Sequence, residues 1–398
     1  MQINVESKPL AAALCGLKLG DAKIFGQKGK KEDAVRVYLH AVNNHLRIGL
    51  GTCDTVCTGY NYDAKCWDTD VALYTLTVEL DAEVREEGYY AVSFNAAKKL
   101  GKFCDVKAAD VQIDGYGDAV TAELCGRKCR VTAYPGEPQD FGQLDDSLFV
   151  PREAVFAVIG STTMPADVPT VYWQYVSVMP REDGTVVSWT DGAQMLWHKC
   201  DPGLPRLRRL IPLFALELLK SQKPADETIE VSRDGIRCGG VLVRFIAQAP
   251  VTYPDNEQIF RVLTPQGSDS WIRVHTTVEE LAGMLKRISS CMGDEVILSA
   301  RHSQLYMLTY DNKGGKCKDF DRCPAAETST NVSFNRRAHS FGAIGLNAHR
   351  LRRALYKQAG PLTLSVQDGD SPVIFDIENS GIRTVLMPLA PAFNRTSI

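Results

Sequence analysis

One short pattern occurs twice in this chain, and its spacing constrains the architecture more than any single residue does. A tyrosine–proline pair, a glutamine four positions after the proline and a phenylalanine two positions later occupy 134–141 and again 253–260. Each copy follows an apolar run typical of a β-strand and precedes an extended segment that leads into a helix. The copies lie 119 positions apart, and a pattern repeated at domain-sized spacing predicts a chain built from equivalent units.

Hairpin-like stretches repeat at a similar spacing. Residues 45–54, 185–191 and 304–311 alternate polar and apolar side chains, and each stretch ends in an aspartate. The three stretches follow short turns, namely Asn43-Asn44, Asp183-Gly184 and His302-Ser303. Alternation after such a turn predicts an antiparallel hairpin with one buried face.

Helices are expected twice in each unit. The first set covers about 8–17, 152–160 and 278–288, and Leu281, Leu285 and Ile288 show the i, i+4, i+7 spacing of a buried helix face. The second set begins near 94, 213 and 346, where asparagine or proline supplies capping chemistry. We therefore predict an α+β fold of three similar domains, each made of two strand–helix–strands half-units, with boundaries at 1–146, 147–265 and 266–398. Residues 61–70 and 312–330 are predicted to be surface loops.

Composition narrows the functional classes. The chain has 398 residues, is 44% apolar and carries a net charge of −3, so each domain can form a core. The chain is not a uniformly basic nucleic-acid-binding protein, although a local basic surface remains possible. No apolar run reaches the length of a membrane span, and the N-terminus lacks the layout of a signal peptide. We expect an intracellular protein whose twelve cysteines are reduced thiols, with no metal or other cofactor.

Basic residues gather on predicted helix faces. In 346–358, Arg350, Arg353 and Lys357 fall on one face opposite apolar residues, and the segment contains no acidic residue. Lys98, Lys99 and Lys102 are arranged in the same way in the first domain, whereas Lys220 in the second lies near Glu217. One such helix is most simply a solvated surface. Two acid-free basic faces at equivalent positions favour contact with a phosphate backbone regardless of base sequence.

Ordered motifs along nearly the full length resemble a known family. The motifs are Met1-Gln-Ile-Asn-Val5, Thr190-Asp191-Gly192, Tyr253-Pro254-Asp255, Ser371-Pro372-Val373-Ile374 and Val385-Leu386-Met387-Pro388-Leu389. In this order and at these intervals, the chain resembles a divergent bacterial-type DNA polymerase III beta subunit, the DNA sliding clamp. The resemblance implies a head-to-tail homodimeric ring that encircles duplex DNA and acts as a processivity factor. It implies a non-catalytic accessory subunit in the cytoplasm of a bacterial cell or a phage-infected host.

The resemblance also implies two sets of site residues. Those facing DNA would be Lys98, Lys99, Lys102, Tyr172, Arg209, Lys220, Arg350, Arg353 and Lys357. A hydrophobic cleft for peptides of the polymerase, the clamp loader and other clamp-binding proteins would contain Trp173, Thr190, Gly192, Ala193, Gln194, Met195, Pro254, Gln258, Ile259, Val385, Met387, Pro388 and Leu389.

The chain departs from the family pattern at the cleft. Ala193-Gln194 replaces the usual His-Arg, Gln258 replaces a basic residue, and Trp173 replaces an aliphatic one. Residues 390–398 extend past the usual end, and their Phe393 gives the hypothesis that this tail covers the cleft. The expected dimer contact near 290–292 is less apolar than an obligate interface requires.

Two other functions compete with the clamp. An enzyme is disfavoured because the sequence lacks the H-E-x-x-H, G-x-S-x-G, P-loop and dinucleotide motifs, and only the nearby His198 and Cys200 suggest a nucleophile pair. The other alternative is a clamp-like peptide-binding adaptor that does not encircle DNA.

Overall fold

The computed structural model describes residues 1–20, 35–61, 63–106, 109–134, 143–160, 171–181, 184–192, 194–200, 208–246, 253–254, 271–289, 295–309, 326–334, 340–367, 370–378 and 382–389. The chain forms two compact units. The first contains Met1–Phe156, Gln174–Val176 and Leu207–Val251, and the second contains Ala157–Trp173, Ser177–Arg206 and Thr252–Ile398.

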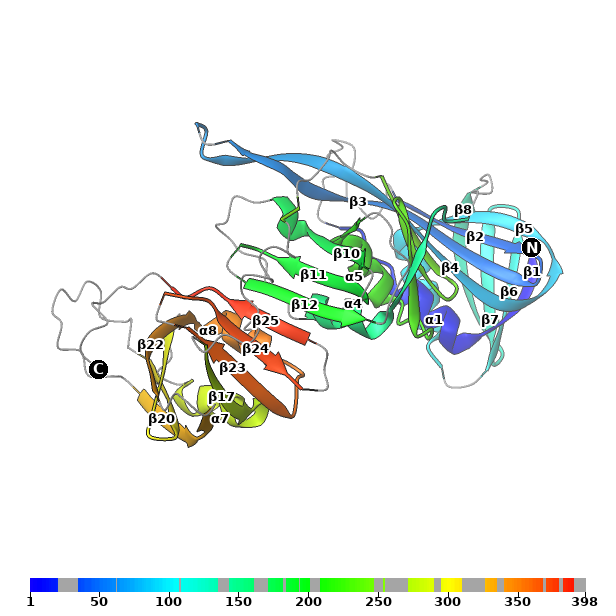
Figure 1. Ribbon diagram of the computed structural model, residues 1–398. Helices are drawn as coiled ribbons and strands as arrows, with labels where there is room; N and C mark the ends of the chain where they lie inside the picture. Colours follow the sequence, from blue (N-terminus) through cyan, green and yellow to red (C-terminus); the bar gives the residue numbers. More distant parts are fainter. Residues whose placement is uncertain are drawn as a thin grey trace. The chain divides into compact units, whose positions relative to one another are not determined.

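The first unit is built on a 12-stranded antiparallel sheet, in the order β1-β6-β7-β8-β5-β2-β3-β4-β16-β15-β14-β9 (Figure 1). Because β1 also pairs with β4, the strands from β1 to β4 in this order close on themselves. The strands are β1 (Gln2–Glu6), β2 (Arg36–Val42), β3 (His45–Asn61), β4 (Cys66–Glu86), β5 (Gly88–Ser93), β6 (Asp110–Tyr116), β7 (Ala119–Leu124), β8 (Arg127–Tyr134), β9 (Leu148–Pro151), β14 (Thr228–Val231), β15 (Gly235–Cys238) and β16 (Val241–Phe245).

Helices α1 (Ser7–Gly16) and α3 (Phe94–Cys104) pack against each other in this unit. The contact is close because Gly101 has no side chain: a Cβ there would lie 2.9 Å from the Leu14 Cβ. Ser93 caps α3, since its hydroxyl accepts a hydrogen bond from the Ala96 N–H at 3.2 Å. Helix α5 (Leu213–Ser221) packs on β16, whereas α4 (Arg152–Gly160) begins just after β9.

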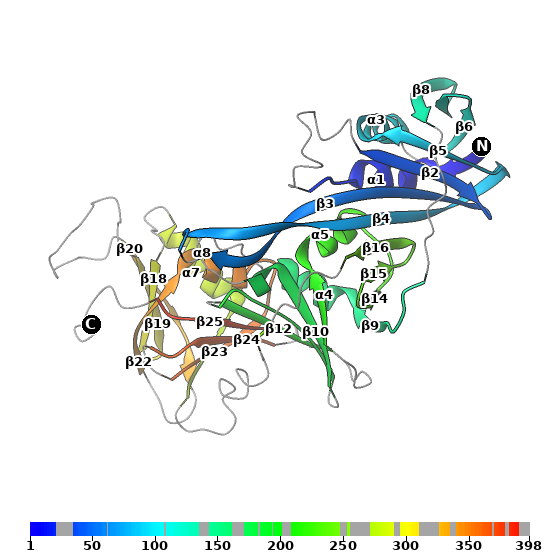
Figure 2. The same cartoon turned by 90° about the horizontal axis from the view of Figure 1, so that it is seen from above.

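The β3–β4 hairpin is longer than expected. At the other end of β3, Asn43 and Asn44 form the turn that joins β2 to β3; their φ values of 51° and 59° fit hairpin twist, which confirms the predicted hairpin turn there. The predicted loop at 61–70 is wrong, because β4 begins at Cys66 and Cys57 pairs with Thr69. β-branched residues such as Thr69 and Val71 suit extended backbone despite the polar composition. The hairpin runs well past the other strands of the first unit (Figure 2).

The second unit contains two sheets. One runs β10-β11-β12-β25-β24-β23-β17-β21 and the other β20-β19-β18-β22. The strands are β10 (Tyr175–Arg181), β11 (Gly184–Thr190), β12 (Gln194–Cys200), β17 (Ile272–Thr277), β18 (Glu295–Arg301), β19 (Gln304–Thr309), β20 (Ala326–Asn331), β21 (Ser333–Phe334), β22 (Ser340–Asn347), β23 (Pro361–Val366), β24 (Val373–Ile377) and β25 (Ile382–Leu386). The predicted loop at 312–330 is therefore wrong from Ala326 onward; its earlier part lies outside the described residues.

The helices of the second unit follow local capping signals. Helix α7 (Val278–Ile288) has the predicted bounds, and the Thr277 hydroxyl accepts from the Glu280 N–H at 3.1 Å. Helix α8 (Ala348–Ala354) starts at the predicted Asn347 cap but ends four residues before Gln358. Lys357 adopts the left-handed region at φ 59°, which a continuing helix cannot contain. These elements enclose a core that includes Leu281, Leu285 and Phe375.

The structure confirms the α+β fold class, and the division into three domains stays a prediction. Among the described residues, no helix is long and apolar enough to cross a membrane. Eight cysteines are free thiols: Cys53, Cys104, Cys129 and Cys238 are buried, Cys57 is half-buried, and Cys15, Cys66 and Cys125 are exposed. In the described part of the chain, no cluster of His, Cys, Asp and Glu could hold a metal ion.

Candidate peptide-binding and DNA-binding surfaces

The turn between β11 and β12 is held by its own side chains. The Thr190 hydroxyl donates to the Gln194 carbonyl oxygen at 2.9 Å and accepts from the Gly192 N–H at 3.1 Å. The Asp191 carboxylate accepts from the Gln194 N–H at 2.7 Å. Gly192 has a φ of 87°, a conformation that L side chains rarely adopt. The Thr-Asp-Gly motif is therefore a structural device that fixes the path of the turn.

The same Asp191 forms a buried ion pair with α8. Its carboxylate oxygen lies 2.8 Å from the Arg350 Nη2, and the two side chains are 0% and 19% exposed. A carboxylate without solvent contact requires such a partner, because desolvation of an unpaired charge is costly. Arg350 was predicted to face DNA, but in this structure its guanidinium is bound to Asp191.

Apolar side chains surround this turn on the adjoining strands. Met195 on β12 pairs with Val385 on β25, and both belong to a small buried cluster with Trp271 and Ile374. The chain then leaves β25 and exposes Met387, whose side chain is 43% accessible. Pro388 and Leu389 are half-buried, and the Leu389 N–H donates to the Gly345 carbonyl at 2.9 Å. The end of the described chain is thus anchored next to an exposed methionine.

Aromatic residues support the turn. Trp173 and Tyr172 lie on a short 3-10 turn, η2 (Val171–Gln174), and the Trp189 indole N–H donates to the Trp173 carbonyl at 2.6 Å. The Tyr172 and Tyr253 rings meet edge to face at 6.0 Å, and the Tyr253 hydroxyl donates to the Ser188 carbonyl at 3.2 Å.

Gly192 lies beside Tyr172, since a Cβ on the glycine would be 3.3 Å from the tyrosine hydroxyl. Tyr172, which was predicted to face DNA, therefore joins this cluster. Tyr253 was not among the predicted site residues, although it begins the second copy of the repeated pattern that could have signalled its role.

We call the described members of the predicted peptide site the candidate cleft. They are Trp173, Thr190, Gly192, Gln194, Met195, Pro254, Val385, Met387, Pro388 and Leu389. Hydrogen bonds and strand pairing bring most of these together around the β11–β12 turn and β25. Trp173, Thr190, Gln194, Met195 and Val385 are buried, so Met387 and Gly192 are the exposed members. Ala193, Gln258, Ile259 and the tail at 390–398 lie outside the described residues, as do 290–292.

The basic helix face of the first unit is partly structural. The Lys98 ammonium donates to the carbonyls of Cys15 and Leu17, at 2.5 and 2.6 Å, where α1 ends. Burial lowers the pKa of Lys98 from its ordinary value. Lys99 and Lys102 are exposed.

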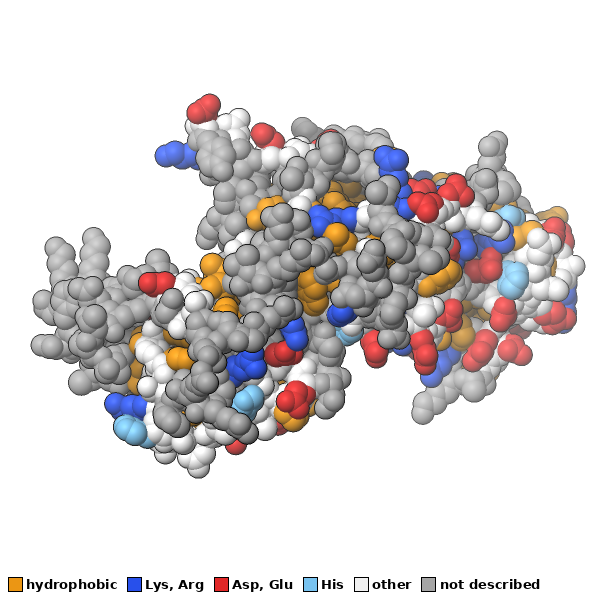
Figure 3. Space-filling view, viewed as in Figure 1, with side chains coloured by type: hydrophobic (Ala, Val, Ile, Leu, Met, Phe, Trp, Pro, Cys, Tyr) orange, Lys and Arg blue, Asp and Glu red, His pale blue; other side chains and the backbone are white. Residues whose placement is uncertain are grey.

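Neither α1 nor α3 contains an aspartate or glutamate, and two further exposed lysines, Lys8 and Lys18, lie on α1 and just after it. The prediction missed these two because it considered α3 alone. Acidic side chains are visible over the strands of this unit (Figure 3). On β4, Asp81, Glu83 and Glu86 are exposed.

The other residues predicted to contact DNA are also of two kinds: some are bound within the protein and some are exposed. Arg209 is only 7% exposed and pairs with Asp146. Lys220 is exposed on α5, with its ammonium 5.7 Å from the centre of the Phe156 ring. Arg353 and Lys357 are exposed at the end of α8. Arg209 and Arg350 are thus bound to carboxylates, whereas the other three side chains are exposed to solvent.

Arg350→Ala should destabilise the protein far more than Arg353→Ala. The first change leaves a buried carboxylate unpaired, at a cost of about 3–5 kcal/mol, whereas the second removes an exposed side chain and should cost less than about 0.5 kcal/mol. Thermal unfolding followed by circular dichroism measures both. Asp191→Asn added to Arg350→Ala should recover part of the loss. Equal melting temperatures for the two single variants would contradict a structural role for the pair.

Comparison with known proteins identifies the fold. No protein family matches the sequence, and no curated protein resembles it significantly. Among solved structures, the DNA polymerase III beta subunit of Thermotoga maritima matches with a TM-score of 0.69 and 14% identity. The DnaN sliding clamp of Bartonella birtlesii bound to griselimycin gives 0.69 and 16%, and the Helicobacter pylori beta clamp bound to a DNA ligase peptide gives 0.68 and 15%. Each match covers 98% of this chain and 100% of the other. The chain therefore has the beta sliding clamp fold over its whole length.

Proposed function

We propose that this protein is a DNA sliding clamp, a divergent relative of the DNA polymerase III beta subunit that encircles duplex DNA. The main support is the full-length correspondence with beta clamp structures, which covers 98% of this chain and 100% of theirs. As a clamp, the protein would be a non-catalytic accessory subunit that tethers a polymerase and other partners. It would act in the cytoplasm of a bacterial cell or a phage-infected host and would be loaded by a clamp loader.

Ring formation requires strand edges that a second copy can pair with. Residues 127–132 of β8 pair with β7 on one side, and the described part of the chain provides no strand on the other side. Strand β20 likewise pairs with β19 alone among the described strands. An open edge exposes backbone N–H and C=O groups that can continue a sheet into another chain. Head-to-tail pairing of β8 of one copy with β20 of the next would use both edges and close a dimer.

Size-exclusion chromatography with in-line X-ray scattering tests this assembly. We expect a mass of twice 43.9 kDa. We also expect the pair-distance distribution to be shifted toward long separations, as it is for a ring with a hole. A monomer, or a dimer without a hole, would contradict the ring and favour the adaptor.

The exposed basic residues suit a surface that slides on DNA. Lys99, Lys102, Arg353 and Lys357 are exposed on or next to two helices that contain no acidic residue. Long flexible cations can contact phosphates without reading bases, and such contacts release counterions and weaken with salt. The acidic strands of the first unit would then face away from DNA.

Charge reversal separates the clamp from the adaptor. Arg353→Glu with Lys357→Glu should weaken binding to a 30-base-pair duplex about tenfold and lower the slope of log affinity against log salt by about two. Fluorescence anisotropy across a salt series measures both quantities. Arg350 is left unchanged because its loss would disturb the Asp191 ion pair. Arg85→Glu, at an exposed position on β4, is the matched control. Equal losses in the control and the test variant would show that the helix residues have no special role.

Peptide capture would use the candidate cleft. The exposed Met387 lies one residue beyond β25, and methionine side chains adapt to varied apolar ligands. The similar clamps of Helicobacter pylori and Bartonella birtlesii were solved with a DNA ligase peptide and with griselimycin. These complexes support a ligand-binding role for this chain.

Met387→Asp should therefore weaken griselimycin binding at least tenfold, because a carboxylate would be desolvated against the ligand. Isothermal titration calorimetry measures the affinity. Tyr116→Asp, which changes an 88% exposed tyrosine on β6, should leave the affinity unchanged. Binding that survives Met387→Asp would place the ligand elsewhere.

The adaptor remains the second candidate. It is favoured by the fact that Arg209 and Arg350, two of the predicted DNA contacts, are paired with carboxylates. An adaptor should retain peptide binding, form no ring and be indifferent to charge reversal at the helix faces.

A further inference from the structure

The β3–β4 hairpin continues beyond the strands that flank it in the first unit (Figure 2). Strand β2 pairs with β3 only up to Leu50, and β16 pairs with β4 only from Tyr74 onward. Residues 52–61 and 66–73 therefore form a two-stranded ribbon, which we call the hairpin extension. Within the described residues, no third strand pairs with it. Two strands alone are only marginally stable in water, so such a ribbon depends on what covers its edges and faces.

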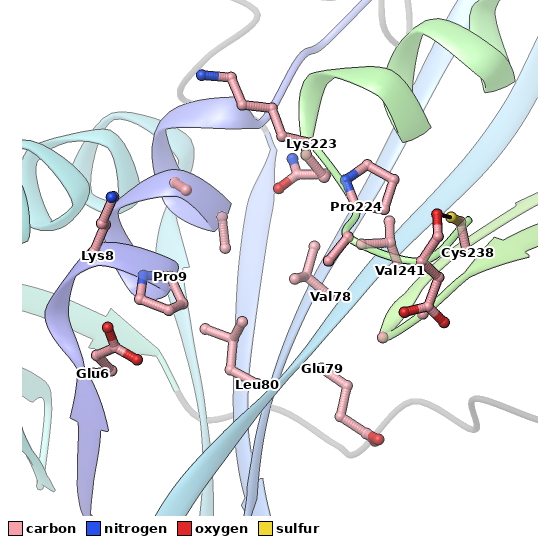
Figure 4. Close-up of a pocket in the computed structure, with 17 residues that line it drawn as sticks. Glu6, Lys8, Pro9, Val78, Glu79, Leu80, Lys223, Pro224, Cys238 and Val241 are labelled. Atoms are coloured by element: carbon pink, nitrogen blue, oxygen red, sulfur yellow. Dashed lines mark hydrogen bonds between the residues drawn. The ribbon is translucent and has the colours of Figure 1, made fainter. Parts of the chain in front are cut away.

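The next part of β4 is covered on both sides. At Val78, β4 pairs with Ile48 of β3 on one side and with Val241 of β16 on the other. Val78 and Leu80 line a pocket of about 450 Å³, together with Pro9 of α1 (Figure 4). The backbone of this part is therefore used within the sheet on both edges, unlike that of the hairpin extension.

The outer edge of β3 in the hairpin extension is partly occupied by other segments of the first unit. The Cys57 N–H donates to the Gln174 Oε1 at 2.8 Å. Gly20 lies against the Cys53 carbonyl, since a Cβ on this glycine would clash with that oxygen. A strand added along β3 would have to displace both contacts, so this edge is not suited to a partner.

The outer edge of β4 in the hairpin extension is open. The last contact from the flanking chain is the Ile246 N–H, which donates to the Leu73 carbonyl at 3.2 Å. Two residues away, the Val71 N–H is bound by the carboxylate of the preceding residue, Asp70, at 2.7 Å. The backbone groups at one edge of a strand belong to every second residue, so those of Thr69 face the same edge. Among the described residues, no strand pairs with Thr69 or Val71 on this side. This edge can therefore continue the sheet into another chain.

Exposed aliphatic side chains lie next to the open edge. Val71 and Leu73 are both 46% exposed, and as alternate residues of one strand they share a face. Ile246 is 61% exposed and lies opposite Leu73, because Phe245 pairs with Tyr74. Aliphatic residues exposed beside an open strand edge favour pairing with another chain.

The hairpin extension is acidic. Between residues 52 and 73 the sequence has four aspartates and one lysine, namely Asp54, Asp63, Asp68, Asp70 and Lys65. Asp68 and Asp70 are exposed and alternate with Val71, so they belong to the opposite face of the strand. A second copy of this edge is a poor partner, because antiparallel pairing about Thr69 would place Asp68 opposite Asp70 of the other chain. A cationic strand is the complementary partner.

We propose that the open edge of β4 at 66–73 binds an extended peptide in which aliphatic and basic residues alternate. The aliphatic side chains pack on Val71, Leu73 and Ile246, and the basic side chains meet Asp68 and Asp70 on the other face. The peptide residue opposite Val71 exchanges both backbone hydrogen bonds with it and lies on the same face, so it is an aliphatic residue. The Val71 N–H then leaves the Asp70 carboxylate, which binds a basic side chain instead. This site does not depend on the clamp function.

The test uses the full chain and a heptapeptide in which four lysines alternate with three valines, labelled with fluorescein at its N-terminus. Fluorescence anisotropy should show saturable binding. N-methylation of the valines removes the N–H groups that face β4 and should weaken binding about tenfold. N-methylation of the lysines, whose N–H groups face away from β4, should leave the affinity nearly unchanged. A block peptide of four lysines followed by three valines has the same charge without the alternation, and it should bind more weakly.

Variants of the protein locate the site. Asp68→Asn with Asp70→Asn keeps an acceptor for the Val71 N–H but removes two charges, so it should weaken binding about tenfold and reduce its salt dependence. Val71→Pro removes the N–H at the edge, a position where proline is tolerated, and should weaken binding several-fold. The matched control is Glu83→Gln with Glu86→Gln, which removes two exposed charges from the part of β4 that pairs with β1. The control should change the affinity less than about twofold.

Three results would overturn the proposal. The first is no binding of the alternating peptide by the unmodified chain up to millimolar concentration. The second is equal binding of the alternating peptide and its block or N-methylvaline form, or equal losses in the aspartate and glutamate variants; either would show attraction by charge alone. The peptide comparison uses the unmodified chain, so it decides the question even if Val71→Pro does not fold. The third is a lower mass for folded Val71→Pro than for the unmodified chain in size-exclusion chromatography, which would assign the edge to a second copy.

Discussion

The buried carboxylate of Asp191 is the constraint on which the second unit depends. An ionised group without solvent contact is stable only when hydrogen bonds and a counter-charge replace the water it has lost. The Gln194 N–H supplies the hydrogen bond and Arg350 supplies the charge. Since Arg350 belongs to α8 and Asp191 to the β11–β12 turn, this single pair fixes a helix against a turn 159 positions earlier in the chain. The strands next to that turn, β12 and β25, then carry the apolar residues of the candidate cleft.

The Asp191–Arg350 ion pair also changes how the basic residues of α8 are interpreted. Arg350 and Arg353 are one helical turn apart and look equivalent in the sequence. In the structure, Arg350 neutralises a buried acid, whereas Arg353 is exposed. Lys98 and Lys99 differ similarly, because the Lys98 ammonium binds the carbonyls at the end of α1. A basic helix face in such a fold therefore combines cations that stabilise the protein with cations that are exposed to solvent. In the proposed contact with DNA, only the exposed group would contribute to the salt dependence of binding.

Local features could be predicted from the sequence. Each prediction that was wrong has a physical cause. Helix α7 was predicted with its observed bounds because its apolar spacing and its Thr277 cap agree. The Asn43-Asn44 turn was predicted because asparagine tolerates the left-handed region. The extension of β4 to Cys66 was missed because composition alone does not reveal cross-strand pairing with β3. The partners of Arg350 and Arg209 lie far away in the sequence, so no periodicity could separate these arginines from exposed ones.

The burial of Gln194 and Trp173 determines how these two departures from the family pattern would affect a ligand of the candidate cleft. Gln194 stands where the family pattern has a charged residue, yet its side chain is 1% exposed and its backbone N–H is held by Asp191. Trp173 likewise is buried, and its carbonyl accepts from Trp189. Neither side chain presents a polar group to solvent. Met387 is therefore the most exposed side chain of the described cleft. An apolar surface of this kind selects ligands by shape and apolar area more than by charge. In the proposed peptide-binding role, Gln194 and Trp173 would therefore favour a broad, apolar recognition of partners over a charge-specific one.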